Sequence, residues 1–492
     1  LAPEDASPDA KGKTTLPIEI EAEVRKRLDR MPSRPIIDFL VQYFMTKVNW
    51  IDQLLHPPWF LAQYRRWWSL GRISSVADIE FAILFLRVCC YASHFLPSPA
   101  YTADSVKGMP LADIRRLCDD TSDALMPICR QLDLQGSLVR VQSIALAGLA
   151  CLSAGRMHLF WEHLSCATRV AQQIGLHPGP GVGAGGMNEI EKEMRRRTFC
   201  NLYLWDSCLS KRLDRIPFLP DDALTPDMTP RMRLLPPGIG LGDDAPDPFM
   251  HRLLRAQLAR FWRQSCRARG SEPKGYDAVA AEQLYEAFCR SFLPTLPPVF
   301  ALARPDRRWD KKVPTLPMQR VMLHMAIFEF LCWNFRPAVL HPTGPHHHHH
   351  HHPVRGYKQI LLAHGKRALA VAALRLLENA GILHGLMTGG GRTRFCGVVL
   401  PTFEGAVTLL CLCADPGFPG DASGDGRTSQ PHAAIQRMAT DPLGARLGSV
   451  SRDECLQAAR GALATLCALA EVSDMADVGA RTLARLVDRV QG

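Results

Sequence analysis

Three aspartates within five residues are the first candidates for chemistry in this chain. The run Asp119-Asp120-Thr121-Ser122-Asp123 fits the pattern D-D-x-x-D. Asp119, Asp120 and Asp123 can share one helix face and gather magnesium, which favours carboxylates together with substrate phosphates. Such a site would serve a helical enzyme of the prenyl-diphosphate type, which also needs a second motif with Ser four residues after Asn. No asparagine meets that spacing: Asn49, Asn188, Asn201, Asn334 and Asn379. We interpret the run as a solvated acidic turn.

Two low-complexity runs could bind phosphate or metal by composition. The glycine-rich run 179–186 precedes a helix, as phosphate loops do, but it lacks the Lys-Ser/Thr ending. The seven histidines His346–His352 could bind nickel or zinc adventitiously, and their surroundings indicate an exposed loop. The motifs G-x-S-x-G, H-E-x-x-H and C-x-x-C do not occur. The sequence therefore predicts no catalytic, cofactor or metal site here, and we do not expect an enzyme.

The composition is that of a globular, mildly basic protein. Of the 492 residues, 47% are hydrophobic and 22% are charged, which excludes a chain disordered throughout. The formal net charge of +10 permits contact with nucleic acid without requiring it. No stretch approaches the roughly 18 uninterrupted apolar residues of a membrane span, so we expect no membrane partner. Most of the sixteen cysteines, Cys89 and Cys467 among them, fall in apolar helical patterns where cysteine behaves as a small buried hydrophobe.

Helical periodicity dominates the chain from Pro35 onward, with apolar residues at three- and four-residue steps. We therefore expect an all-α fold, a large multi-helix array whose helices are joined by Pro/Gly-rich loops. The expected helices beyond the opening segment cover 76–96, 111–133, 138–154, 156–175, 188–211, 248–269, 276–293, 316–336, 356–380, 398–414, 452–471 and 474–490.

The segment 188–222 combines a charged half and an apolar stripe on one helix. Its opening turns hold two i,i+4 pairs with the acid first, Glu191 with Arg195 and Glu193 with Arg197. Asp206 then borders the stripe formed by Leu202, Trp205 and Leu209. An acid in that position is usually the partner of a buried arginine. We predict that Asp206 is buried and paired with one of three arginines, namely Arg169, Arg196 or Arg215. The arginines at 260, 263, 267 and 269 are read as a solvated face.

This segment resembles the middle homology region of fungal binuclear zinc-cluster transcription factors. The shared signature is an acidic turn, an Arg-Arg-Arg block, aromatic residues, an Asp and then a Gly-Arg-Pro-like turn. Segments 155–177 and 32–69 fit the family as well, so the match covers roughly 32–235. The residues of the family motif are Arg169, Glu193, Arg195, Arg196, Arg197, Tyr203, Asp206, Arg215 and Pro217. Asp214 stands where the family usually has Gly, so the turn is expected to differ.

The resemblance suggests a division of the chain into three parts. Residues 1–33 are expected to be a tail or linker, 34–235 the middle homology region, and 236–492 a helical continuation of the same regulatory unit. Loops 340–354 and 415–430 are expected to be disordered. The six-cysteine zinc cluster of the family is missing from this sequence, which also has no initiator methionine. We therefore expect zinc only in an upstream DNA-binding module, or a member of the family that never had the cluster.

The resemblance implies a regulatory region of a nuclear transcription factor that does not itself read DNA bases. DNA would be contacted only through the upstream module, and co-regulators or the transcription machinery, a small-molecule effector and a second copy of the chain are the other expected partners. The rival hypotheses are the prenyl-diphosphate-type enzyme that would use Asp119, Asp120 and Asp123, and a helical scaffold in a DNA-bound complex. We place an effector pocket beside helices 156–175 and 188–211, near Trp161, Tyr203 and Trp205.

Overall fold

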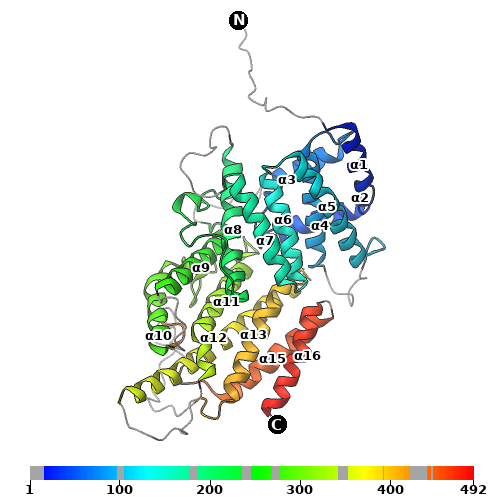
Figure 1. The fold of residues 1–492 in the computed structure, drawn as a ribbon. Helices are drawn as coiled ribbons and strands as arrows, with labels where there is room; N and C mark the ends of the chain where they lie inside the picture. The colour runs from blue at the N-terminus through cyan, green and yellow to red at the C-terminus, as the bar shows by residue number, and fades with distance from the viewer. Residues whose placement is uncertain are drawn as a thin grey trace.

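The computed structural model is an all-α array in which the two halves of the chain pack side by side (Figure 1). Its residues are 73% helical, which confirms the predicted fold class. The residues described are 16–96, 105–176, 187–234, 245–268, 277–341, 353–391, 393–419, 440–444, 447–471 and 473–491. Within these ranges the strands are limited to β1 (Ser105–Val106) and β2 (Met109–Pro110), an antiparallel pair. The loops expected to be disordered and the histidine run fall largely outside the described residues.

The first half of the chain consists mainly of α-helices and ends with the long helix α8. Its elements are α1 (Ile18–Leu28), α2 (Arg34–Tyr43), α3 (Pro57–Trp68), α4 (Val76–Ser93), α5 (Leu111–Leu132), α6 (Leu138–Ser153), α7 (Met157–Gln173) and α8 (Glu189–Leu213). Helix α4 is central, because it packs on α2, α5 and α6 and is buried from Asp78 to its end. The nearly continuous apolar sequence of this segment has the same cause, since no face of α4 is left for solvent.

The second half adds helices that close over the free side of α8. They are α9 (Met250–Ala268), α10 (Ala278–Ala287), α11 (Leu316–Phe335), α12 (Pro353–Gly391), α13 (Val399–Cys413), α15 (Arg452–Ala470) and α16 (Asp474–Gln491). Helix α9 packs on both α8 and α11, and α11 packs along α12. Figure 1 shows α8, α9 and α11 meeting in the middle of the molecule. Short π and 3-10 turns join or extend the helices: Phe44–Val48, Pro226–Met228, Phe288–Phe292, Leu293–Thr295, Pro298–Phe300, Arg336–Leu340 and Cys396–Val398.

Side-chain caps explain several helix starts. Ser75 forms a capping box with Asp78 at the start of α4, and Ser137 and Asn188 accept hydrogen bonds from the third residue of α6 and α8. At the end of α8, Asp214 stands where the family usually has Gly, and the turn still forms. Asp214 adopts the left-handed conformation with φ 51°, and its backbone N–H donates to the carbonyl of Ser210. Aspartate tolerates this region better than most residues, so the helix still stops here.

Among the residues that the structure describes, one helical window is long and apolar enough to cross a membrane by length and composition. It runs over Cys396–Cys413, which the sequence analysis did not single out because the run is interrupted. In the structure this window is 61% buried, and α13 packs against α12, α15 and α16. These contacts are those of a core helix in a multi-helix array.

The structure revises three sequence-based expectations. Residues 18–28, inside the expected tail, form α1, whose Val24 is fully buried against the core. The aspartate run lies within α5 rather than in a turn. Cys467 lies on the exposed face of α15, although Cys89 is buried as expected. The last difference arises because an apolar pattern does not show which face of a helix meets its neighbours.

Candidate functional site

In the charged half of α8, the side chains of Glu193 and Arg197 are buried. The Glu193 carboxylate is 0% exposed and accepts hydrogen bonds from Arg197 Nε at 3.0 Å and from Arg196 Nη1 at 3.1 Å. It also accepts the backbone N–H of Arg231 at 3.0 Å. Glu193 therefore ties α8 to the segment that follows Pro226–Met228, and its charge is balanced by the two arginines.

Arg197 extends this network to three other parts of the chain. The guanidinium is 2% exposed, donates to Gln53 Oε1 at 2.8 Å and to the carbonyl of Met232 at 2.8 Å. Its Cζ lies 4.9 Å from the ring centroid of Phe249, and Asp247 is 3.7 Å away. A buried guanidinium needs most of its five donors satisfied, and these contacts supply them. The arrangement is structural, because each partner belongs to the protein.

Asp206 is fully buried, as the sequence predicts, but its partners differ from the prediction. Its two carboxylate oxygens accept the backbone N–H groups of Phe218 and Leu219, each at 2.9 Å. The nearest arginine is Arg263 of α9, at 3.7 Å. Burial raises the pKa of Asp206, and the two N–H donors and Arg263 oppose that shift.

The predicted partners of Asp206 and the predicted solvated face of Arg263 were therefore both wrong. Arg169 and Arg215 are exposed, and Arg196 is bound to Glu193. Arg263 is buried, with Nε 2.6 Å from Asp221 and Nη1 3.0 Å from the Ser207 hydroxyl. Its Nη2 donates to the carbonyl of Leu219. Helix α9 packs on α8, although some forty residues separate Asp206 from the start of α9 in the sequence. The spacing of residues alone does not reveal this contact.

The other motif residues have separate positions. Arg195 donates to the carbonyl of Ile174 at 2.6 Å and so ties α8 to the end of α7. Tyr203 is buried, donates to the carbonyl of Asp221 at 3.0 Å, and lies under the Arg263 guanidinium. Pro217 is half-buried in the turn after α8. These residues fix the path of the chain around α8, and none of them joins Trp205 at a common cavity.

The aspartate run of α5 is a structural clamp on α4. Asp119 and Asp123 both accept from the buried Arg87 of α4, one from each terminal nitrogen. Asp120 lies 3.9 Å from the exposed Arg116. Because two of the three carboxylates are engaged by one guanidinium, the run does not present a free set of magnesium ligands. In the described part of the chain no group of three His, Cys, Asp or Glu residues is arranged to hold a metal ion.

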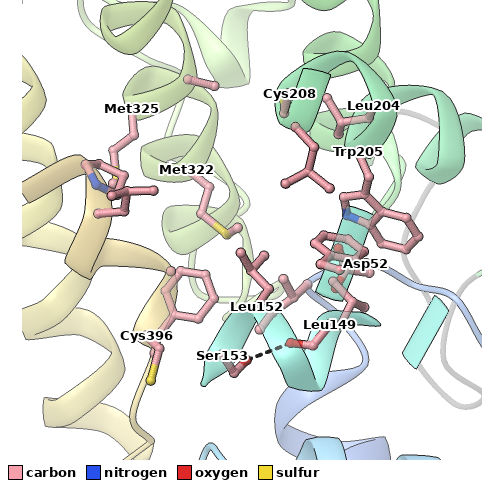
Figure 2. A pocket seen from close by; sticks show the side chains of 18 of the residues that line it. Asp52, Leu149, Leu152, Ser153, Leu204, Trp205, Cys208, Met322, Met325 and Cys396 are labelled. Atoms are coloured by element: carbon pink, nitrogen blue, oxygen red, sulfur yellow. Dashed lines mark hydrogen bonds between the residues drawn. The ribbon is translucent and has the colours of Figure 1, made fainter. Parts of the chain in front are cut away.

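A largely apolar cavity lies where the two halves of the chain meet. Its volume is about 210 Å³, larger than the engineered cavity of roughly 150 Å³ that binds benzene in another protein. The walls come from α4, α6, α7 and α8 on one side and from α9, α11, α12 and α13 on the other. Figure 2 shows Met322 of α11 reaching toward Leu152 and the side chains of α8. The cavity is therefore built by segments far apart in the sequence.

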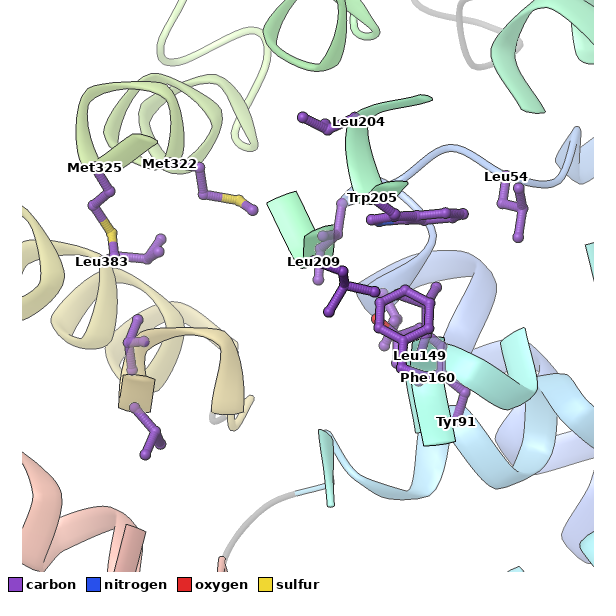
Figure 3. Close-up of a cluster of buried hydrophobic side chains, with 14 of the residues drawn as sticks. Leu54, Tyr91, Leu149, Phe160, Leu204, Trp205, Leu209, Met322, Met325 and Leu383 are labelled. Atoms are coloured by element: carbon purple, nitrogen blue, oxygen red, sulfur yellow. The ribbon is translucent and has the colours of Figure 1, made fainter. Parts of the chain in front are cut away.

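Aromatic and thioether side chains form opposite walls of this cavity. Trp205 and Phe160 pack edge to face with ring centroids 6.0 Å apart, and Met322, Met325 and Leu383 lie across the gap (Figure 3). Of the three aromatics proposed for an effector pocket, Trp205 is the one that lines the cavity. Trp161 instead packs on Phe218, with ring centroids 4.1 Å apart. Tyr203 faces Arg263 on another side of α8. Methionine walls adapt readily to guests of different shape.

One end of the cavity is charged. Arg212 lies between Glu329 and Glu404, at 3.0 Å from the latter. Arg252 pairs with Asp52 at 3.1 Å and donates to Asn201 at 2.8 Å. Arg255 also lines this end, and within the described residues it has no hydrogen bond or ion pair. None of these arginines was singled out from the sequence. For Arg252 and Arg255 the one available signal was their position on the apolar stripe of helix 248–269.

The chemistry available at this cavity is binding rather than covalent catalysis. The two cysteines on its wall, Cys208 and Cys396, have pKa values raised by burial, which keeps their thiols protonated and poorly nucleophilic. Among the described residues no serine or cysteine forms a relay with histidine and acid at this cavity. The fold and site thus define an all-α domain with a largely apolar cavity where the two halves of the chain meet.

Comparison with known proteins identifies the family. The model of the fungal specific transcription factor domain matches residues 40–228. Transcription factor xilB of Penicillium rubens is 41% identical over 476 residues, which cover 95% of this chain and 67% of the relative. Probable transcription factor sol4 of Alternaria solani is also 41% identical, over 97% of this chain and 82% of its own length. The chain therefore belongs to the fungal transcription factors. A shorter match, 35% over 83 residues, is to nitrogen assimilation transcription factor nit-4 of Neurospora crassa.

Proposed function

We propose that this chain is the regulatory region of a fungal nuclear transcription factor and that a small effector acts through the cavity at Trp205. The observation that carries the proposal is the position of the cavity between the family-matched helices and the C-terminal helices. A ligand held there contacts both halves, so its affinity depends on how they pack. An effector can shift an equilibrium only through such a difference in affinity between two conformations.

DNA is contacted in this proposal through a separate zinc-binding module and not through the helical array. Within the described residues no zinc-type ligand cluster is present, and the buried Arg197 of α8 and Arg263 of α9 are engaged by protein groups rather than offered to phosphate. The helical region masks or exposes the attached DNA-binding and activation segments. The engagement of Asp119 and Asp123 by Arg87 favours this reading over a magnesium-dependent enzyme.

A reporter fusion tests the regulatory role. Residues 1–492 are joined to an unrelated DNA-binding module, and output is compared with that of the bare module under several nutrient conditions. We expect the fusion to alter output, and Ala326→Leu, which partly fills the cavity from α11, to change it again. Ala468→Leu on the exposed face of α15 is the matched control. If the fusion behaves as the bare module under every condition, the regulatory hypothesis is wrong and the hypothesis of a helical scaffold takes its place.

A further inference from the structure

The charged end of the cavity contains two guanidinium groups whose hydrogen-bonding capacity is not fully used. Arg252 is 2% exposed, and although two of its nitrogens are bound, Nη2 is buried without a partner. Arg255 follows one turn later on the same face of α9 and lacks a partner for Nε as well. Buried polar groups are nearly always hydrogen-bonded, so these two nitrogens beside one cavity are available to an added acceptor.

The carboxylates already present do not fill this role. Asp52 is bound to Arg252, and Glu329 is bound to Arg212, which also binds Glu404. Within the described residues none of these carboxylates comes within 4.0 Å of the Arg255 guanidinium. Desolvation lowers the pKa of Arg255, and the nearby Arg252 lowers it further, while Cys208, Glu329 and Asp52 only partly oppose this shift. An added anion would relieve that penalty.

The remaining walls limit the size and polarity of the anion. The cavity holds about 210 Å³, and its other walls are formed mainly by Trp205, Phe160, Leu383 and methionine side chains. A guest must therefore combine one anionic group with a compact apolar body. A carboxylate matches the planar guanidinium through paired N–H donors, whereas a fully hydrated phosphate would leave the apolar walls uncovered.

We propose that this cavity binds a small monocarboxylic acid, with its carboxylate held by Arg255 and the free Nη2 of Arg252 and its apolar body against Trp205 and Met322. This inference rests on the proposed regulatory function, because it names the ligand class for the same cavity. Glu329 at the same end is paired with Arg212, which offsets its negative charge toward the anion. The acid would link α9 and α11 to α8 through a single guest.

Direct binding to the purified 492-residue chain tests this ligand class. The probes are benzoate and hexanoate, each paired with its neutral amide, and inorganic phosphate, measured by calorimetry at up to about 10 mM because small ligands bind weakly. We expect at least one acid to bind tenfold or more tightly than its amide and than phosphate. Absence of binding by both acids, or equal binding of the amides or of phosphate, overturns the proposal.

Matched variants locate the binding site. Arg255→Met should weaken binding of the acid about tenfold, and Arg255→Lys should retain most of it. Arg260→Met, on the same helix but away from the cavity, should leave affinity unchanged. Circular dichroism of the free variants checks that they fold. Unchanged affinity in Arg255→Met contradicts the assignment. If reporter regulation survives while acid binding fails, the ligand class is wrong and the regulatory role stands.

Discussion

The carboxylate of Asp206 accepts the backbone N–H of Leu219 at 2.9 Å, across the turn that follows α8. This contact joins the middle of a buried helix to the chain that leaves its end. Phe218 N–H makes the matching bond to the other oxygen. Asp206, the acid of the family motif, therefore stabilises the turn. Arg263 Nη1 lies 3.7 Å from its Oδ2. Its role is carried by backbone donors more than by an ion pair.

Asp206→Ala should lower the free energy of unfolding by about 2–4 kcal/mol, because the backbone N–H groups of Phe218 and Leu219 lose their acceptors inside the protein. Arg263 still keeps Asp221, which limits the loss. Chemical denaturation measures the difference. Asp222→Ala, an exposed acid of the same loop, is the control and should be neutral. A neutral Asp206→Ala would show that the turn is held by other contacts.

Glu193→Ala should be among the most destabilising substitutions on α8, at about 3–5 kcal/mol, because it leaves the buried Arg197 without its closest carboxylate. Glu189→Ala, four residues earlier and exposed, removes a surface pair with Lys192 and should leave stability close to that of the parent chain. Thermal unfolding of the two variants side by side provides the comparison. Similar melting temperatures would contradict the importance of the buried pair.

Because Asp119 and Asp123 both bind Arg87, we expect their substitutions to have non-additive effects on the free energy of unfolding. Asp119→Ala alone should cost less than about 1 kcal/mol, since Asp123 still holds the guanidinium and both carboxylates are partly exposed. The double variant Asp119→Ala with Asp123→Ala strands Arg87 and should cost more than the sum of the single changes. A double-mutant cycle measures the coupling. Strict additivity would mean that the two carboxylates act independently.

Asp214→Gly should stabilise the protein by about 0.5–1 kcal/mol. Asp214 has φ 51° at the end of α8, a conformation that glycine adopts without a steric penalty. Asp214→Ala should have the opposite sign, because alanine gains nothing in the left-handed region. The change in denaturation midpoint decides between them. Destabilisation by glycine would indicate that the aspartate side chain itself supports the turn.

Stability should fall on acidification because two buried histidines remain neutral in the folded protein. Desolvation lowers the pKa of His251 to about 3, with Arg252 and Arg255 as further causes, and that of His324 to about 4. Below about pH 6.5 the unfolded chain binds protons that the folded chain does not, so stability present at pH 7 is lost toward pH 4. Each histidine should contribute roughly 2 kcal/mol of loss between pH 7 and 5.

Melting temperatures of a variant measure this pH dependence. His324→Gln keeps a donor for the carbonyl of Phe300 and should flatten the fall between pH 7 and 5. His158→Gln, on an exposed position of α7, should leave the slope as it is in the parent chain. An unchanged slope in His324→Gln would assign the acid sensitivity to other groups.

The sequence by itself determined most of the helices, the fold class and the family. Helical patterns such as 111–133, 138–154 and 452–471 match α5, α6 and α15 within a residue or two, because apolar periodicity is a local property of a helix that packs on one face. The motif around Arg197 and Asp206 also identified the family, which the matches over 40–228 and over most of the chain confirm. The burial of Asp206 followed from its place beside an apolar stripe.

The tertiary structure alone decided which charges meet and where the chain leaves a cavity. Arg263 reached Asp206, Arg87 reached Asp119, and Arg255 reached the cavity wall through helix packing between residues far apart in the chain. A single sequence contains no term for such non-local contacts, and an arginine on an amphipathic helix has the same local pattern whether it meets solvent or a neighbour. The cavity between α8, α9 and α11 likewise results from the packing of helices from both halves of the chain. No single segment of the sequence encodes it.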